Sequence, residues 1–155
     1  MLIVAAQFPT DLPAITQIFR AYAASLPIDL GYQGFDGELA SLPGKYAPPT
    51  GALLIARDAN GAALGCVAMR PLDETWICEM KRLYVAPAGR GRGLGKQLAR
   101  AIIEAARAAG HREMRLDTLA TMHEARALYR ALGFTEIAAY YDTPIESTVF
   151  MSLRL

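Results

Sequence analysis

The sequence has few of the residues that mark metal centres, disulfide frameworks or nucleic-acid binding. Its only cysteines, Cys66 and Cys78, form no Cys-x-x-Cys pair, and the chain has only two histidines. A zinc site or disulfide framework therefore has little support, and a reducing compartment, the cytoplasm, is expected. Lys and Arg total 16 against 15 Asp and Glu, a formal net charge of +1. This balance argues against a polyanion-binding surface, so we expect no nucleic-acid partner.

Long apolar runs are also absent. No stretch approaches the roughly 20 apolar residues that a helix needs to cross a bilayer. The apolar start, residues 1–6, has no basic segment and is soon broken by Pro9 and Asp11, so we expect neither a signal peptide nor a membrane partner. With 155 residues, 53% of them hydrophobic, the chain is long enough to form one domain over residues 1–155 with its own core.

Apolar residues at helical spacing predict three amphipathic helices and one short helix. Thr10 or Asp11 is the expected cap of the first helix, and Thr121-Met122-His123-Glu124 has the form of a capping box. The short helix falls in an irregular segment rich in Gly and Pro. The predicted helices span about 12–22, 36–41, 94–109 and 124–132.

Runs of apolar and β-branched residues between these helices predict strands. The pair Asn60-Gly61 is expected to supply the positive φ angles of a tight hairpin turn. The sum is an α/β (α+β) fold with a mixed, mostly antiparallel central sheet flanked by helices. The predicted strands span about 2–6, 52–56, 63–69, 76–85, 113–118, 136–139 and 148–153.

A glycine-rich turn lies between the strand that stops at Pro87 and the helix that begins near Leu94. Glycines occupy positions 89, 91, 93 and 95, and basic residues positions 90, 92 and 96. Unpaired N–H groups at a helix start favour a phosphate group, and glycine lets it approach closely. Isolated glycines in loops are more often simple turn formers, but the strand and the helix on either side favour the phosphate here.

Two familiar phosphate motifs fail in this turn. A P-loop needs Gly where this chain has Arg90, and Ser or Thr where it has Gln97. A dinucleotide fingerprint needs a third glycine where the chain has Lys96 or Leu98.

Two other motifs resemble the signatures of the GNAT superfamily of N-acetyltransferases. The first is Arg90-x-x-Gly93-x-Gly95, preceded by Leu83-Tyr84-Val85-x-Pro87. The second is Ala125-x-x-Leu128-Tyr129-x-x-x-Gly133-Phe134. Together with the order of elements they cover nearly all of the chain. The resemblance implies a GNAT-like fold and an acetyl-CoA-dependent N-acetyltransferase that transfers an acetyl group to a primary amine.

The resemblance also implies a set of cofactor-binding residues. The CoA pyrophosphate would be held largely by backbone amides from Arg92 to Lys96. The splayed strand would supply a backbone N–H for the oxyanion. Many members of the family carry an Asn that contacts the pantetheine arm, where this chain has Met122, which leaves that contact open. The implied cofactor-binding residues are Leu83, Tyr84, Val85, Arg90, Gly91, Arg92, Gly93, Leu94, Gly95 and Lys96.

Glu79 and Tyr129 are the candidate catalytic residues. An amine is mostly protonated at neutral pH, so the transfer needs a base, and the resemblance implies Glu79. Strict alternation instead places Glu79 with Lys81 on one face as an ordinary solvent-facing residue, unless a bulge changes the phase. The resemblance implies that Tyr129 is the weak acid that protonates or hydrogen-bonds the leaving thiolate, whereas its apolar stripe is also typical of a packing residue. The cysteines lack a paired His, so direct transfer in a ternary complex is expected. His111 and His123 are interpreted as surface residues.

The acceptor is expected to be a small amine or amino acid, and a peptide N-terminus is the alternative. By analogy with the family, residues 31–46, with Tyr32, Phe35, Asp36 and Glu38, and the turn 140–142 line the acceptor side. A non-catalytic acyl-CoA-binding module on the same fold is the competing function. A homodimer is possible through an exposed strand such as Thr148 to Leu153.

Overall fold

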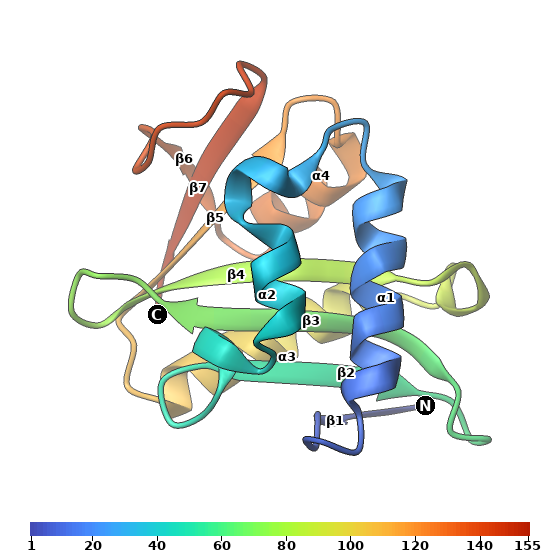
Figure 1. Cartoon of the computed structure of the whole chain (residues 1–155). Coiled ribbons are helices and arrows are strands. Elements are labelled where there is room, and N and C mark those ends of the chain that lie inside the picture. The colour runs from blue at the N-terminus through green and yellow to red at the C-terminus, as the bar shows by residue number, and fades with distance from the viewer.

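The computed structural model describes all residues from 1 to 155, and one seven-stranded sheet forms its centre (Figure 1). The strand order is β1-β2-β3-β4-β5-β7-β6, and only the β4–β5 pair is parallel. The predicted mixed, mostly antiparallel sheet is thus confirmed. The strands are β1 (Leu2–Ala5), β2 (Ala52–Arg57), β3 (Ala63–Pro71), β4 (Ile77–Val85), β5 (Glu113–Leu119), β6 (Thr135–Ile137) and β7 (Thr148–Arg154).

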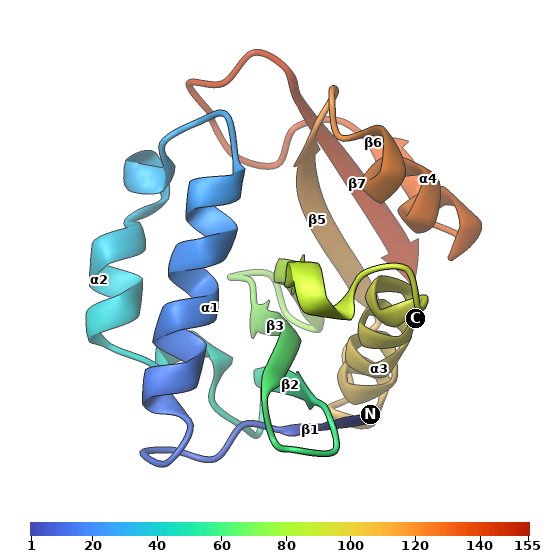
Figure 2. The ribbon, with the colours of Figure 1, turned by 90° about the vertical axis from the view of Figure 1, so that its right-hand side faces the viewer.

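Helices cover both faces of the sheet (Figure 2). On one face α1 and α2 pack over β2 and β3, around buried residues such as Phe19 and Ile55. On the other face α3 and α4 pack around Leu98, Ile102 and Met114. None of the helices is both long and apolar enough to cross a membrane. The helices are α1 (Leu12–Ser25), α2 (Phe35–Ala40), α3 (Leu94–Ala108) and α4 (His123–Ala131), with 3₁₀ turns η1 (Leu30–Gln33), η2 (Gly44–Tyr46) and η3 (Pro87–Gly89).

The sheet divides between β4 and β5. These strands pair only over Ile77–Glu79 and Glu113–Arg115, while β5 pairs with β7 along its whole length. In Figure 1, β5 and β7 accordingly turn away from the plane of β2, β3 and β4. A bulge accompanies the division: the β3–β4 register shifts between Cys66 and Ala68, and Arg82 has a φ of 60°. A bulge of this kind is the feature expected to change the phase of β4.

Two predicted turn and cap features are wrong. In the turn at 58–62 only Gly61 has a positive φ, because the Asp58 carboxylate accepts the amides of Asn60 and Ala62 and holds a longer loop. The capping box at Thr121 does not form, because the residue in the N-cap position of α4 is Met122, and no side chain caps this helix.

The cap of the first helix and the exposed late strand also differ from prediction. The Asp11 carboxylate makes no cap bond to α1, since it accepts the amide of Gln7 and pairs with Arg57. β7 is flanked by β5 along its whole length and by β6 over residues 150–152, so Thr148 to Leu153 is not the exposed edge strand that was expected.

Candidate functional site

The glycine-rich turn presents a row of free backbone donors at the start of α3. Gly91 and Gly93 have φ angles of 81° and 69°, in the left-handed region that favours glycine. The amides of residues 91–96 donate to no acceptor in the protein, and the first amide bonded in this row is that of Gln97, to the Gly93 oxygen. A Cβ built at Gly91 or Gly93 meets no atom within 4 Å, so the space in front of the turn is open. The geometry is that of an anion site.

The basic residues of this turn are exposed, as an anion site requires. Arg90, Arg92 and Lys96 all lie at the surface. The Arg90 Nε donates to the Val85 oxygen at 3.2 Å, which ties the turn to the end of β4.

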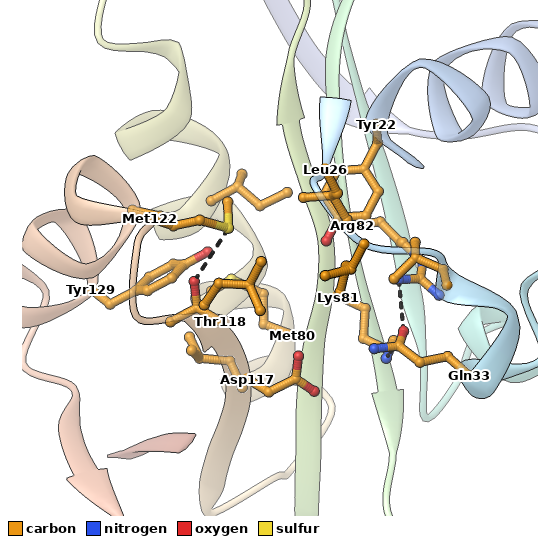
Figure 3. Close-up of a pocket in the computed structure, with 16 residues that line it drawn as sticks. Tyr22, Leu26, Gln33, Met80, Lys81, Arg82, Asp117, Thr118, Met122 and Tyr129 are labelled. Carbon is orange, nitrogen blue, oxygen red and sulfur yellow. Dashed lines mark hydrogen bonds between the residues drawn. The ribbon is translucent and has the colours of Figure 1, made fainter. Parts of the chain in front are cut away.

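A cleft opens where β4 and β5 part (Figure 3). From residue 80 onward β4 has no strand partner on its β5 side, so main-chain groups of this edge face the cleft. Leu83 lines the cleft. The Tyr84 ring instead packs against Tyr22, with centroids 6.2 Å apart, and the Val85 side chain packs into the α3 core. Of these three predicted residues, Tyr84 and Val85 can therefore reach a ligand through their main chain.

Tyr129 extends from α4 into this cleft. The side chain is buried, with its ring 5.8 Å from that of Phe134, so the packing interpretation is part of the answer. Its hydroxyl nevertheless forms no hydrogen bond to another residue of the cleft, which it lines (Figure 3). Burial raises the pKa of Tyr129, which keeps the phenol protonated and able to donate. Beside it, the Met122 sulfur accepts a hydrogen bond from the Thr118 hydroxyl at 3.7 Å (Figure 3). The bond takes up the Thr118 hydroxyl, and the neighbouring residues of this wall, such as Leu119 and Ala125, are apolar.

Glu79 is buried and not solvent-facing. It is 1% exposed and lies in the last residue pair that β4 forms with β5. Its carboxylate accepts the Arg70 Nε at 3.0 Å and the Tyr140 hydroxyl at 2.5 Å, and the Lys81 ammonium lies 3.7 Å away. The solvent-facing interpretation is wrong because the loop after β6 folds Tyr140 over this position. Glu79 and Lys81 do share a face, since the bulge comes only at Arg82.

The charges around Glu79 set its protonation state. Burial alone would raise the pKa of this carboxyl, but Lys81, Tyr140 and Arg70 together hold it below its usual value. Glu79 is therefore a carboxylate at neutral pH. Burial lowers the pKa of Lys81, and Glu79 opposes that shift.

Arg82 organises the other side of the bulge. The residue is 3% exposed, and its guanidinium forms two hydrogen bonds of 2.9 Å with the Glu38 carboxylate of α2. It lies over the rings of Tyr22 and Phe35, at 5.6 and 5.3 Å from their centroids. The Gln33 side chain accepts from both Arg82 and Lys81, at 3.0 and 3.1 Å. The segment from η1 to α2 is thus fastened to β4.

A second hollow lies beside the cleft, lined by residues from η1, α2, β3, β4 and the loop after β6. Gln33 and Lys81 line both the cleft and this hollow, so the two spaces adjoin. The residues of this second hollow are Tyr32, Gln33, Glu38, Arg70, Glu79, Lys81, Tyr141 and Asp142.

The predicted acceptor side is brought together only in part. Tyr32, Glu38 and Tyr141 line the hollow, and the Tyr141 hydroxyl donates to Asp117 of β5 at 2.8 Å. Phe35 is buried against Arg82, and Asp36 is exposed outside the hollow.

Three polar residues of this region were not predicted from the sequence. Arg70 lies opposite Glu79 in the β3–β4 register, and Arg82 and Asp117 join it from β4 and β5. Only the strand register, counted from the loop at 72–76, could have indicated Arg70, and no local pattern marks the others.

The histidines and cysteines lie apart from these hollows. His123 is exposed, as predicted. His111 is buried, which corrects the surface interpretation: the positive φ of Gly110 turns the chain inward, and the His111 Nε2 lies 2.8 Å from the Thr50 oxygen. Both cysteines are buried, and burial raises the pKa of the Cys78 thiol to about 12 and that of Cys66 further. Neither thiol is a ready nucleophile.

Comparisons with known proteins agree with this geometry. The model of the acetyltransferase (GNAT) family matches residues 15–134. An uncharacterized N-acetyltransferase of Schizosaccharomyces pombe is 42% identical over 151 residues, covering 97% of this chain and 93% of the relative.

The names of two further similar proteins include a cofactor in one case and an acceptor in the other. The solved structure of yncA from Salmonella typhimurium, with its cofactor acetyl-CoA, has a TM-score of 0.72 and 25% identity, covering 99% of this chain and 93% of that one. An aminoglycoside N(6′)-acetyltransferase type 1 of Stenotrophomonas maltophilia is 30% identical over 145 residues, covering 86% of this chain and 95% of the relative.

Proposed function

Because this chain belongs to the GNAT family of acetyltransferases and takes its acetyl group from acetyl-CoA, we propose that it acetylates the primary amine of a small molecule by direct transfer. The observation that carries this proposal is the junction of the cleft and the hollow at Lys81 and Gln33. Two adjoining spaces allow the thioester and the amine to be bound together, as a ternary complex requires. The related aminoglycoside acetyltransferase also acts on a small molecule that carries amino groups.

In this proposal the turn between β4 and α3 holds the CoA pyrophosphate. The amides from Arg92 to Lys96 are free to donate to it, and Arg90, Arg92 and Lys96 supply surrounding positive charge. The pantetheine arm then follows the unpaired edge of β4 into the cleft. An amide of Leu83, Tyr84 or Val85 on that edge stabilises the oxyanion of the tetrahedral intermediate, a contribution of about 3 kcal/mol for one such donor.

Glu79 and Tyr129 act at the two ends of the transfer. Glu79 lines the second hollow, here called the acceptor hollow, as a buried carboxylate. It accepts the amine proton through a water molecule, and the proton then passes from Glu79 to solvent. Its low pKa makes it a relay and not the final holder of this proton. Tyr129 donates a hydrogen bond to the departing CoA sulfur, because its free hydroxyl lines the cleft, and the released thiolate then takes its proton from solvent. The buried thiols of Cys66 and Cys78 favour direct transfer over an acetyl-enzyme.

Release of free thiol from acetyl-CoA tests the proposal. The protein is mixed with acetyl-CoA and a panel of small amines, amino acids and peptides with free N-termini. Glu79→Gln and Tyr129→Phe are expected to lower kcat by about 10- to 100-fold with little change in the KM for acetyl-CoA. Glu136→Gln, at an exposed carboxylate paired with Arg126, is the matched control and should keep full activity.

Three outcomes would contradict parts of this proposal. Unchanged kcat in both variants removes the roles of Glu79 and Tyr129. Turnover of peptides alone replaces the small acceptor by a peptide N-terminus. Binding of acetyl-CoA with no thiol released from any amine favours the acyl-CoA-binding module instead.

A further inference from the structure

Arg70 stands in the acceptor hollow with most of its donors unused. It lies near the end of β3, with its side chain 32% exposed, and its Nε donates to Glu79 at 3.0 Å. Its two terminal nitrogens, which carry four N–H groups, have no acceptor in the protein. Arg82 nearby is different, because all three of its guanidinium nitrogens are bonded to Glu38 or Gln33.

The free end of Arg70 faces open space on two sides. It lines the hollow that contains Glu79 and Lys81, and it also lines a neighbouring hollow beside η2, lined by Ser41, Gly44 and Tyr46. A guanidinium fork that is fixed at Nε and open at both terminal nitrogens fits the two oxygens of a carboxylate.

The acidic residues around Arg70 already have partners. Both oxygens of Glu38 are bonded to Arg82, and both oxygens of Glu79 accept bonds, from Arg70 and Tyr140. Asp117 accepts the Tyr141 hydroxyl. None of these carboxylates accepts a hydrogen bond from the terminal nitrogens of Arg70, and neither Glu38 nor Asp117 forms a salt bridge with it, so a ligand can take that position.

The same acids also decide between kinds of anion. Glu38 and Glu79 line the hollow together with Arg70 and Lys81, and these two acids repel a phosphate dianion more strongly than a carboxylate monoanion. The site therefore favours a singly charged group.

We propose that the acceptor is a primary amine that also carries a carboxylate, such as an amino acid, and that the terminal nitrogens of Arg70 bind this carboxylate. This inference rests on the proposed amine acetylation and names its substrate class. Because the Arg70 Nε is bonded to Glu79, a carboxylate held by Arg70 places the amino end of the acceptor beside Glu79 and Lys81, where the hollow joins the cleft. Asp142, exposed at the rim, attracts the ammonium form on entry.

Matched acceptors test this inference. Each amino acid of the panel is compared with its carboxamide and with the amine that lacks the carboxyl group, and kcat/KM is measured for each. The protein is expected to prefer the carboxylate by about 100-fold, as two charge-assisted hydrogen bonds allow. In Arg70→Gln this preference should fall to near 1, while Arg70→Lys should keep a small part of it.

The ratio of carboxylate to carboxamide activity within one variant is the deciding quantity. Loss of Arg70 also removes a donor from Glu79, but that change affects both acceptors of a pair and cancels in the ratio. Arg57→Gln, at an arginine paired with Asp11 outside the hollow, is the matched control and should keep the full preference.

The failures of the two proposals can be told apart. If amines are acetylated with no preference for a carboxylate, or phosphonate analogues are preferred, this inference is overturned and amine acetylation stands. The same holds if Arg70→Gln keeps the preference. If no amine is acetylated, the proposed function fails and this inference fails with it.

Discussion

The bulge in β4 can be tested with two separate variants, Arg82→Gly and Arg82→Ala. Arg82 is an L-amino acid held at a φ of 60°, a conformation that costs a non-glycine residue about 1–2 kcal/mol. The cost is offset by the pair with Glu38, by Gln33 and by the two aromatic rings. Either replacement leaves the Glu38 carboxylate, 17% exposed, without its partner, and this should lower the free energy of unfolding by about 3–5 kcal/mol.

The order of the two variants reports the backbone. Glycine adopts the positive φ without strain, so Arg82→Gly should be more stable than Arg82→Ala by about 1 kcal/mol in urea unfolding. At the next residue, Leu83, whose φ is not positive, the order should be reversed, with Ala more stable than Gly by about 0.5–1 kcal/mol. If the free energy of unfolding of Arg82→Ala equals or exceeds that of Arg82→Gly, the bulge is not where the structure places it.

Three further predictions concern the glycine-rich turn before α3, the Glu79 carboxylate and the close packing of β3 at Gly65. Gly93→Ala should raise the KM for acetyl-CoA while kcat at saturation holds, because a φ of 69° is strained for alanine; Gly61→Ala, with a φ of 83° at a distant loop, should cost similar stability without changing KM. The pKa of Glu79 in the folded protein is lowered from its usual value of 4.5. The stability that its partners contribute is therefore fully present above pH 4.5 and is lost as the pH falls through the lowered pKa. The difference in unfolding free energy between the wild type and Tyr140→Phe should therefore shrink in acid, and a constant difference from pH 7 to pH 3 would argue against the pair. Gly65→Ala should destabilise by about 1–3 kcal/mol in urea unfolding, because its Cβ would lie 2.7 Å from the Tyr84 oxygen and 3.0 Å from the Leu98 Cδ1; wild-type stability would refute that close packing.

Local patterns predicted most of the fold. The stripe of Leu98 and Ile102 identified α3, and two apolar runs on either side of a turn identified β2 and β3. Boundaries shifted by one to three residues, as at Trp76, which has a φ of 68° and lies outside β4. The cap predictions failed where a tertiary partner competed: Asp11 binds Gln7 and Arg57 instead of the helix.

The candidate site was predictable only where one segment forms it. The turn from Gly91 to Lys96 contains its own donors and its own helix start, so its sequence was sufficient. The acceptor hollow is formed by side chains that are distant in sequence, such as Gln33, Arg70 and Tyr141. Their meeting depends on strand register and on the packing of α2, which no local pattern specifies.

The free amides of the glycine turn are the centre of this account, and their NMR signals test it most directly. With ¹⁵N-glycine labelling only 13 amide signals are expected, one for each glycine. Addition of acetyl-CoA should shift Gly91, Gly93 and Gly95 in a saturable way, whereas pantetheine, which lacks the pyrophosphate, should leave them in place, and Gly61 should move in neither case. If these three signals stay unchanged at saturating acetyl-CoA, the pyrophosphate does not bind at the start of α3 and the account is wrong.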